Sequence, residues 1–246
     1  MPNTSARLRL FCFPFAGGGA SAYRGWAREL PAAVKVCPVQ YPGRETRITE
    51  PLQTALAVLM RMAAGALEPL LDEPYALFGH SMGALAAFEL TREIARRGLR
   101  PPEQLVVSAY RAPTMPHWSA LLYDLPHDEF VERLRKLEGT PQAALESPEL
   151  MQMMLPVLRA ECQVCDQYRL RDETPLAVPL AAFGGRNDPR GWRSGTAALA
   201  RTGRRRLGTA DVRRRPRLHP GRTGRGAGGT VRRAAAALPL TDLRPG

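Results

Sequence analysis

Short apolar runs alternate with helical patterns along the first 110 residues of this chain. The runs are apolar and partly aromatic, as buried strands are, at residues 8–13, 34–40, 75–78 and 104–109. The segments between them place apolar residues at helical spacing, at residues 20–30, 54–71 and 84–97. Strands that alternate with helices of this kind predict an α/β fold, with a mostly parallel sheet and helices on both faces.

The alternation stops at residue 113 and resumes near residue 175. Between them the pattern predicts short amphipathic helices and no strand, at residues 128–137, 148–158 and 159–170. Residues 176–183 return to a strand pattern. In such a fold, an all-helical insertion after a central strand usually forms a lid over the catalytic face. A helical decoration that only adds core is the alternative.

The net charge of +12 lies entirely in the last part of the chain. Residues 191–246 contain 14 arginines and two aspartates, whereas residues 1–190 contain 21 basic and 21 acidic side chains. The predicted folded part therefore has no electrostatic preference for nucleic acid. Because no apolar stretch approaches the roughly 20 residues of a membrane span, and no signal-peptide pattern is present, we expect a cytoplasmic protein without membrane contact.

A Gly-x-Ser-x-Gly pattern occupies residues 79–83, between a predicted strand and a predicted helix. This arrangement is typical of a nucleophile elbow, a sharp turn that exposes a serine hydroxyl at the positive end of a helix. Glycines are needed on both sides because a side chain there would collide with the strand or the helix. Ser81 is therefore the candidate nucleophile.

Acyl transfer also needs an acid, a histidine base and donors for an oxyanion. Asp188 follows a late strand, the usual place for the acid, although an aspartate that caps the next helix is the alternative. The Gly-rich loop after the first strand can bring the N–H of Ala16 beside that of Met82 as an oxyanion hole. The loop lacks the spacing of a dinucleotide site and a Walker lysine. Cys162 and Cys165 are spaced as in redox or zinc pairs, but without a second pair.

Several motifs together resemble the type II thioesterases of polyketide and non-ribosomal peptide assembly lines, at residues 13–18, 41–44, 78–84, 155–160 and 184–189. The resemblance implies an α/β-hydrolase that needs no cofactor or metal. Its implied partner is an acyl or peptidyl carrier protein, whose phosphopantetheine arm carries the acyl chain that the enzyme removes. It also implies that Ser81 forms the acyl-enzyme, that Asp188 orients the base, and that His80 is part of the elbow and not the base.

The resemblance ends near residue 190. The base should follow Asp188 by roughly 27 residues, after a helix and a strand. His219 is the only histidine beyond Asp188, 31 residues later, and its neighbours lack the family's Gly-Gly-His turn. His219 is therefore the candidate base by its position after Asp188, although its neighbours do not match the family. We expect this chain to be poorly stable and weakly active or inactive.

The composition of residues 191–246 gives the predicted domain boundary. This segment has one aromatic residue and no isoleucine, phenylalanine, tyrosine, methionine, lysine or glutamate. Such a composition predicts disorder, with no buried helix or final strand. We expect a hydrolase core at residues 1–190, with its lid at about 113–175, followed by an Arg/Gly-rich tail that a shifted reading frame would explain. Two other functions stay open: an esterase for small free esters, and an inactive hydrolase-fold protein that binds carrier proteins or, through its tail, nucleic acid.

Overall fold

A parallel sheet forms the centre of the protein. The computed structural model describes residues 6–115, 121–136, 147–172, 174–185, 203–205, 210–212 and 227–240. Within these ranges seven strands form one sheet, and every strand pair is parallel. The strands are β1 (Leu8–Phe13), β2 (Val34–Pro38), β3 (Tyr75–His80), β4 (Gln104–Ser108), β5 (Leu176–Gly185), β6 (Gly203–Arg205) and β7 (Ala210–Val212). Their order is β2-β1-β3-β4-β5-β6, and β7 also pairs with β5. The predicted α/β class is confirmed.

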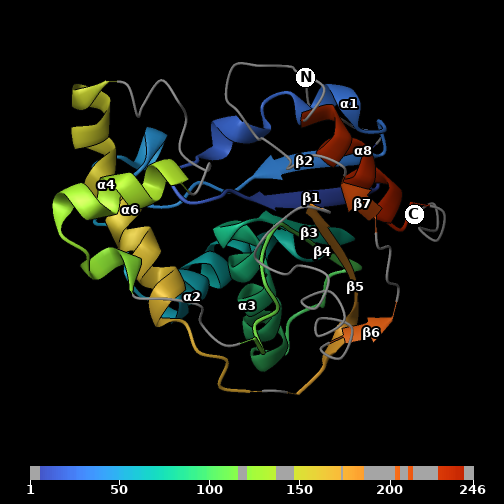
Figure 1. Ribbon diagram of the computed structural model, residues 1–246. Coiled ribbons are helices and arrows are strands. Elements are labelled where there is room, and N and C mark those ends of the chain that lie inside the picture. The colour runs from blue at the N-terminus through green and yellow to red at the C-terminus, as the bar shows by residue number, and fades with distance from the viewer. Residues whose placement is uncertain are drawn as a thin grey trace.

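Helices cover both faces of this sheet (Figure 1). On one face lie α2 (Leu56–Leu67) and α3 (Met82–Arg96), and on the other lie α1 (Trp26–Glu29) and α8 (Ala227–Ala237). Side chains on a strand alternate between the two faces. Phe11 and Phe13 of β1 accordingly join the core under α2 and α3, whereas Leu10 and Cys12 join the core under α1 and α8.

The insertion between β4 and β5 is helical over its described residues, and lies at one end of the sheet (Figure 1). It comprises η4 (Leu122–Asp124), α4 (His127–Lys136) and α6 (Pro148–Gln167). The prediction of separate helices at 148–158 and 159–170 is wrong, because α6 runs through both. The buried side chains Met151, Leu158 and Cys162 of α6 pack on one face against α4. This packing on both sides of Pro156 stabilises one continuous helix.

The first predicted helix is also interrupted. Residues 20–30 form a 3-10 turn, η1 (Ala20–Tyr23), and the short α1, instead of one helix. Gly25 lies at the break, where glycine's conformational freedom opposes a continuous helix. Two further 3-10 turns, η2 (Glu45–Arg47) and η3 (Glu68–Leu70), precede and follow α2.

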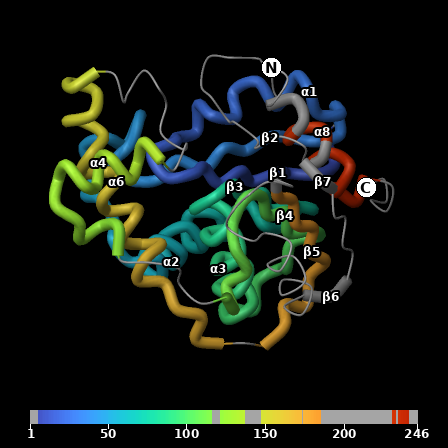
Figure 2. Tube along the Cα trace, viewed as in Figure 1, coloured from blue at the N-terminus to red at the C-terminus, as the bar shows by residue number. Residues whose placement is uncertain are grey.

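The expectation that residues 191–246 bury no helix is wrong for α8. Val231, Ala234 and Leu238 are buried in the same core as Trp26 of α1, and the trace shows α8 beside α1 (Figure 2). Their spacing of three and four residues makes one apolar face, which small alanine side chains allow to approach closely. The composition predicted no burial because it averages over the polar faces as well.

The order of the strands reverses direction between β1 and β3. The connection from β1 leads to β2 on one side, and the chain then returns to β3 on the other side of β1. In open parallel sheets, ligands bind at the carboxyl ends of the strands where the direction reverses in this way. Among the described residues, no helix is both long and apolar enough to cross a membrane.

Candidate functional site

Ser81 forms a one-residue turn between β3, which ends at His80, and α3, which begins at Met82. Its φ of 53° and ψ of −124° lie in a region that non-glycine residues rarely adopt, at a cost of about 1–3 kcal/mol. The Ser81 N–H donates to the Ser108 carbonyl at 2.8 Å, which fixes the turn against β4. The side chain is half-buried and does not cap α3. The hydroxyl therefore stands at the positive end of a helix of 15 residues.

The two glycines of the elbow are required by close backbone approaches. A Cβ at Gly79 would overlap the carbonyl group of Gly83, and a Cβ at Gly83 would overlap the carbonyl oxygens of Phe13 and Pro14. The start of α3 therefore rests directly on the end of β1. This contact brings the elbow beside the Gly-rich loop.

The Gly-rich loop begins with a tight turn. The Gly18 N–H donates to the Phe15 carbonyl at 2.9 Å, and Gly17 has a φ of 76°, as the third residue of a type II turn requires. Among the described residues, no group accepts a hydrogen bond from the N–H of Ala16 or of Met82. The two predicted oxyanion donors thus belong to two segments that meet at the carboxyl ends of β1 and β3. Neither N–H has an acceptor among the described residues.

His80 is buried and contacts Ser108 and Phe15. Its Nδ1 lies 3.1 Å from Ser108 Oγ, and its ring meets the Phe15 ring edge-on at 6.1 Å. Burial lowers the pKa of His80 to about 4, so the imidazole is neutral near pH 7. Its contacts join the ends of β3 and β4 to the loop.

A buried ion pair that the sequence did not predict links the loop to the helical insertion. Arg44, on the turn after β2, pairs with Glu161 of α6. Arg44 Nη1 also donates to the Phe15 carbonyl at 3.3 Å, and the Glu161 carboxylate accepts from Gly17 N–H at 2.7 Å. The Arg44 guanidinium lies 5.0 Å from the centre of the Tyr41 ring. Burial raises the pKa of Glu161 to about 7, although Arg44 and the Gly17 N–H oppose this rise.

Asp188 and His219 lie outside the described residues, so their predicted roles stay predictions. Cys162 and Cys165 lie on α6 and form no disulfide among the described residues, and burial raises the pKa of both. A raised pKa disfavours the thiolate that redox chemistry and zinc binding use. Within the described ranges, no group of three or more histidine, cysteine, aspartate or glutamate side chains is arranged to hold a metal ion.

Sequence reasoning missed Glu161 because its partners are far away along the chain. Nothing in its own helical segment distinguishes it from a surface glutamate. Only a weak indication in the sequence pointed to Arg44 as part of the site, since Arg44 ends one of the segments that resemble the family. The segment around residues 155–160 likewise indicated the helix, but not the contact that the next residue makes.

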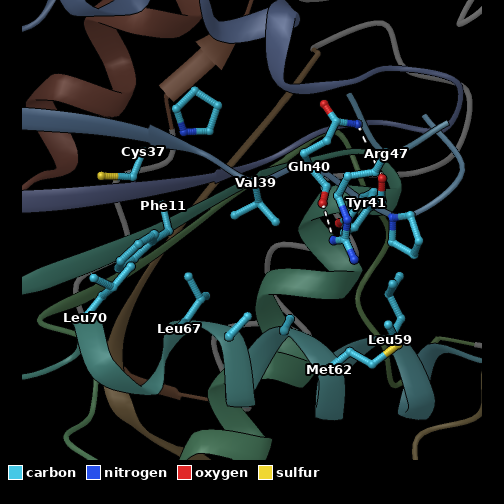
Figure 3. A pocket seen from close by; sticks show the side chains of 14 residues that line it. Phe11, Cys37, Val39, Gln40, Tyr41, Arg47, Leu59, Met62, Leu67 and Leu70 are labelled. Carbon is cyan, nitrogen blue, oxygen red and sulfur yellow. Dashed lines mark hydrogen bonds between the residues drawn. The ribbon is translucent and has the colours of Figure 1, made fainter. Parts of the chain in front are cut away.

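A separate cavity of about 340 Å³ opens between β2 and α2 (Figure 3). Its walls are mostly apolar, with Phe11, Val39 and Leu67 among them, and Arg47 lies at its polar end. The guanidinium of Arg47 donates to the Gln40 carbonyl at 2.9 Å. Neither Ser81 nor the Gly-rich loop lines this cavity, so we do not assign it as the binding site of the group that reacts with Ser81.

Comparison with known proteins agrees with this arrangement. The sequence profile described as thioesterase domain matches residues 8–232. The gramicidin S biosynthesis protein GrsT of Aneurinibacillus migulanus is 43% identical over 186 residues, which cover 76% of this chain and 73% of that protein.

Two solved structures have the same fold at moderate identity. RedJ, a thioesterase from the prodiginine biosynthetic pathway of Streptomyces coelicolor, superposes with a TM-score of 0.86 at 34% identity, over 96% of this chain and 92% of that one. YbtT, a type II thioesterase from the yersiniabactin NRPS/PKS pathway, superposes with a TM-score of 0.76 at 27% identity, over 95% and 90% of the two chains. The chain therefore belongs to the thioesterase family, among the type II thioesterases of non-ribosomal peptide and polyketide pathways.

Proposed function

We propose that this chain removes acyl groups from the phosphopantetheine arm of a carrier protein through an acyl-enzyme on Ser81. The observation that carries the proposal is the elbow: a strained serine at the start of α3, beside two N–H groups that have no acceptor among the described residues. The names of the related proteins place them in peptide and polyketide pathways, which supports carrier-bound substrates.

In the proposed reaction, the Ser81 hydroxyl attacks the thioester carbonyl and its proton passes to a histidine base. The carbonyl oxygen becomes an oxyanion, which the N–H groups of Ala16 and Met82 stabilise. The phosphopantetheine thiol leaves with a proton, and water then hydrolyses the ester on Ser81 by the same route. We assign Asp188 and His219 to the acid and the base.

We further propose that turnover by this chain is impaired, because His219 lacks the sequence context of the family's base. Removal of one member of a triad leaves about 10³–10⁴-fold acceleration over water, supplied by binding and the oxyanion hole. Ser81 would then acylate slowly, and the acyl-enzyme would persist.

The test is mass spectrometry of the protein over a time course of exposure to an acyl-carrier thioester, continued long enough to detect slow acylation. We expect an acyl adduct on Ser81 that the Ser81→Ala variant does not form. Failure of the wild-type protein to acquire the adduct, with an intact and folded sample, would refute the proposal. A nitrophenyl ester tested in parallel distinguishes an esterase for small free esters, which would prefer it over the carrier thioester.

A further inference from the structure

The two peptide groups on either side of Ala16 are held by one buried ion pair. On one side, the Phe15 carbonyl accepts from Arg44 Nη1 as well as from Gly18 N–H. On the other side, Gly17 N–H donates to Glu161 at 2.7 Å. Arg44 and Glu161 pair with each other, although they come from the turn after β2 and from α6.

The contact on the Phe15 carbonyl determines where the Ala16 N–H points. The carbonyl of Phe15 and the N–H of Ala16 belong to one planar trans peptide, so they point in opposite directions. A guanidinium that fixes the carbonyl therefore fixes the N–H as well. Hydrogen bonds from charged donors are roughly twice as strong as neutral ones, which makes this an effective restraint.

The helical insertion contributes the second restraint. Glu161 and Leu158 are three residues apart on α6, so they share one face of the helix. The Leu158 side chain lies against Gly17, in the space that a Cβ would need, and the Glu161 carboxylate accepts from the same residue. Gly17 is thus the point where α6 rests on the loop.

We infer that Arg44 and Glu161 are positioning residues, whose ion pair ties α6 to the loop and holds the Ala16 N–H in place for the oxyanion. This inference rests on the proposed function, since it assigns the held N–H to the reaction. The side chains are only 5% and 8% exposed, so water does not weaken the pair. The geometry of the oxyanion hole therefore depends on the position of α6. Glu161 of α6 accepts from the Gly17 N–H and also pairs with Arg44, which holds the Phe15 carbonyl.

The matched control is Arg92, which is also 5% exposed. Arg92 pairs with Asp172 and donates to the Thr174 carbonyl at 2.9 Å, so it anchors the segment before β5 to α3. It makes no recorded contact with the loop among the described residues. Arg92→Met therefore removes a buried arginine of equal exposure without touching the restraints on Ala16.

The experiment compares Arg44→Met, Glu161→Gln and Arg92→Met in the full-length chain. Hydrogen exchange at the Gly17 amide measures the restraint without any turnover. The labelling rate of Ser81 by a fluorophosphonate measures the hole, because its adduct places an oxygen where the oxyanion forms. We expect exchange to rise at least about tenfold and labelling to fall about 10–100-fold in the first two variants, in line with a misplaced oxyanion donor. Glu161→Leu, which also lacks an acceptor for Gly17, should exceed Glu161→Gln in both effects.

If Arg44 and Glu161 only stabilised the fold, Arg92→Met would change Gly17 exchange and Ser81 labelling in the same way as Arg44→Met. We expect instead that Arg92→Met lowers the melting temperature less than Arg44→Met, because its partner Asp172 is 55% exposed. Gly17 exchange and Ser81 labelling in Arg92→Met should stay within about twofold of wild type. Unchanged exchange in Glu161→Leu, or faster exchange with unchanged labelling, would overturn the inference while the proposed function stands. A wild-type protein whose Ser81 neither labels nor acylates would instead overturn the proposed function, and the inference with it.

Discussion

The substitution Gly83→Ala tests whether the start of α3 rests on β1. The added Cβ would overlap the carbonyl oxygens of Phe13 and Pro14. These are backbone atoms at the end of a strand that pairs with β2 on one side and β3 on the other, so they cannot rotate away. Overpacking costs about 1–3 kcal/mol, and a backbone collision belongs at the upper end. Alanine recovers about 1 kcal/mol of helix propensity, which leaves a net loss of about 2 kcal/mol.

Thermal unfolding measures this loss. In a domain of this size 1 kcal/mol corresponds to about 2–4 °C, so we expect the melting temperature to fall by roughly 4–8 °C. Gly65→Ala in α2 is the matched control, since the nearest atom to its Cβ is Arg97 Nη1 at 3.8 Å. There only the propensity gain of about 1 kcal/mol remains, and the melting temperature should rise by roughly 2–4 °C.

The same substitution also tests the oxyanion hole. To relieve the collision, α3 must move away from the loop, and the Met82 N–H moves with it. A displacement of about 1 Å costs on the order of 100-fold in rate, so Ser81 labelling should fall by that factor in Gly83→Ala and stay unchanged in Gly65→Ala. If Gly83→Ala is as stable as wild type, the contact between α3 and β1 is not the one described, and the reasoning fails.

Three other substitutions test separate parts of the molecule. Ser81→Gly relieves the strain of the positive φ at the elbow, so the free energy of unfolding should rise by about 1–3 kcal/mol. The same variant should no longer be acylated. An unchanged denaturation midpoint would show that the turn is not strained. Leu238→Ala should lower stability by about 2–4 kcal/mol if α8 is docked, whereas a change below about 0.5 kcal/mol would place α8 in solvent. The pKa of His80, depressed to about 4 against 6.5 when unfolded, should contribute stability that is present above pH 6.5 and lost as the pH falls towards 4. Denaturation at pH 7 and pH 5 measures this loss, which should vanish in His80→Gln, and a titration of His80 near pH 6.5 by NMR would contradict it.

The elbow and the sheet could be predicted from the sequence because their determinants are local. The apolar run at β3, the glycines at 79 and 83 and the helix after them each specify a conformation within a few residues. The glycine pattern also predicted that a side chain at either position would collide with the neighbouring strand or helix. The predicted donors Ala16 and Met82 followed from the same local logic.

The ion pair and the last helix depend on contacts that local patterns do not encode. Arg44 and Glu161 are unremarkable polar residues until the fold brings α6 to the turn after β2. For α8, the spacing of Val231, Ala234 and Leu238 was readable as an apolar face, but the arginines and glycines around it outweighed that face in the composition. An average over a segment cannot detect a narrow stripe that is sufficient for docking.

The pairing of α8 with α1 has a consequence for how the chain emerges during translation. Residues near both ends of the described chain cover the same face of the sheet, over Leu10 and Phe78. That face cannot close until the ribosome has released the chain as far as Leu238. A nascent or prematurely terminated chain would expose this apolar surface to chaperones and to other chains, whereas the opposite face, under α2 and α3, could already be buried once β5 had been made.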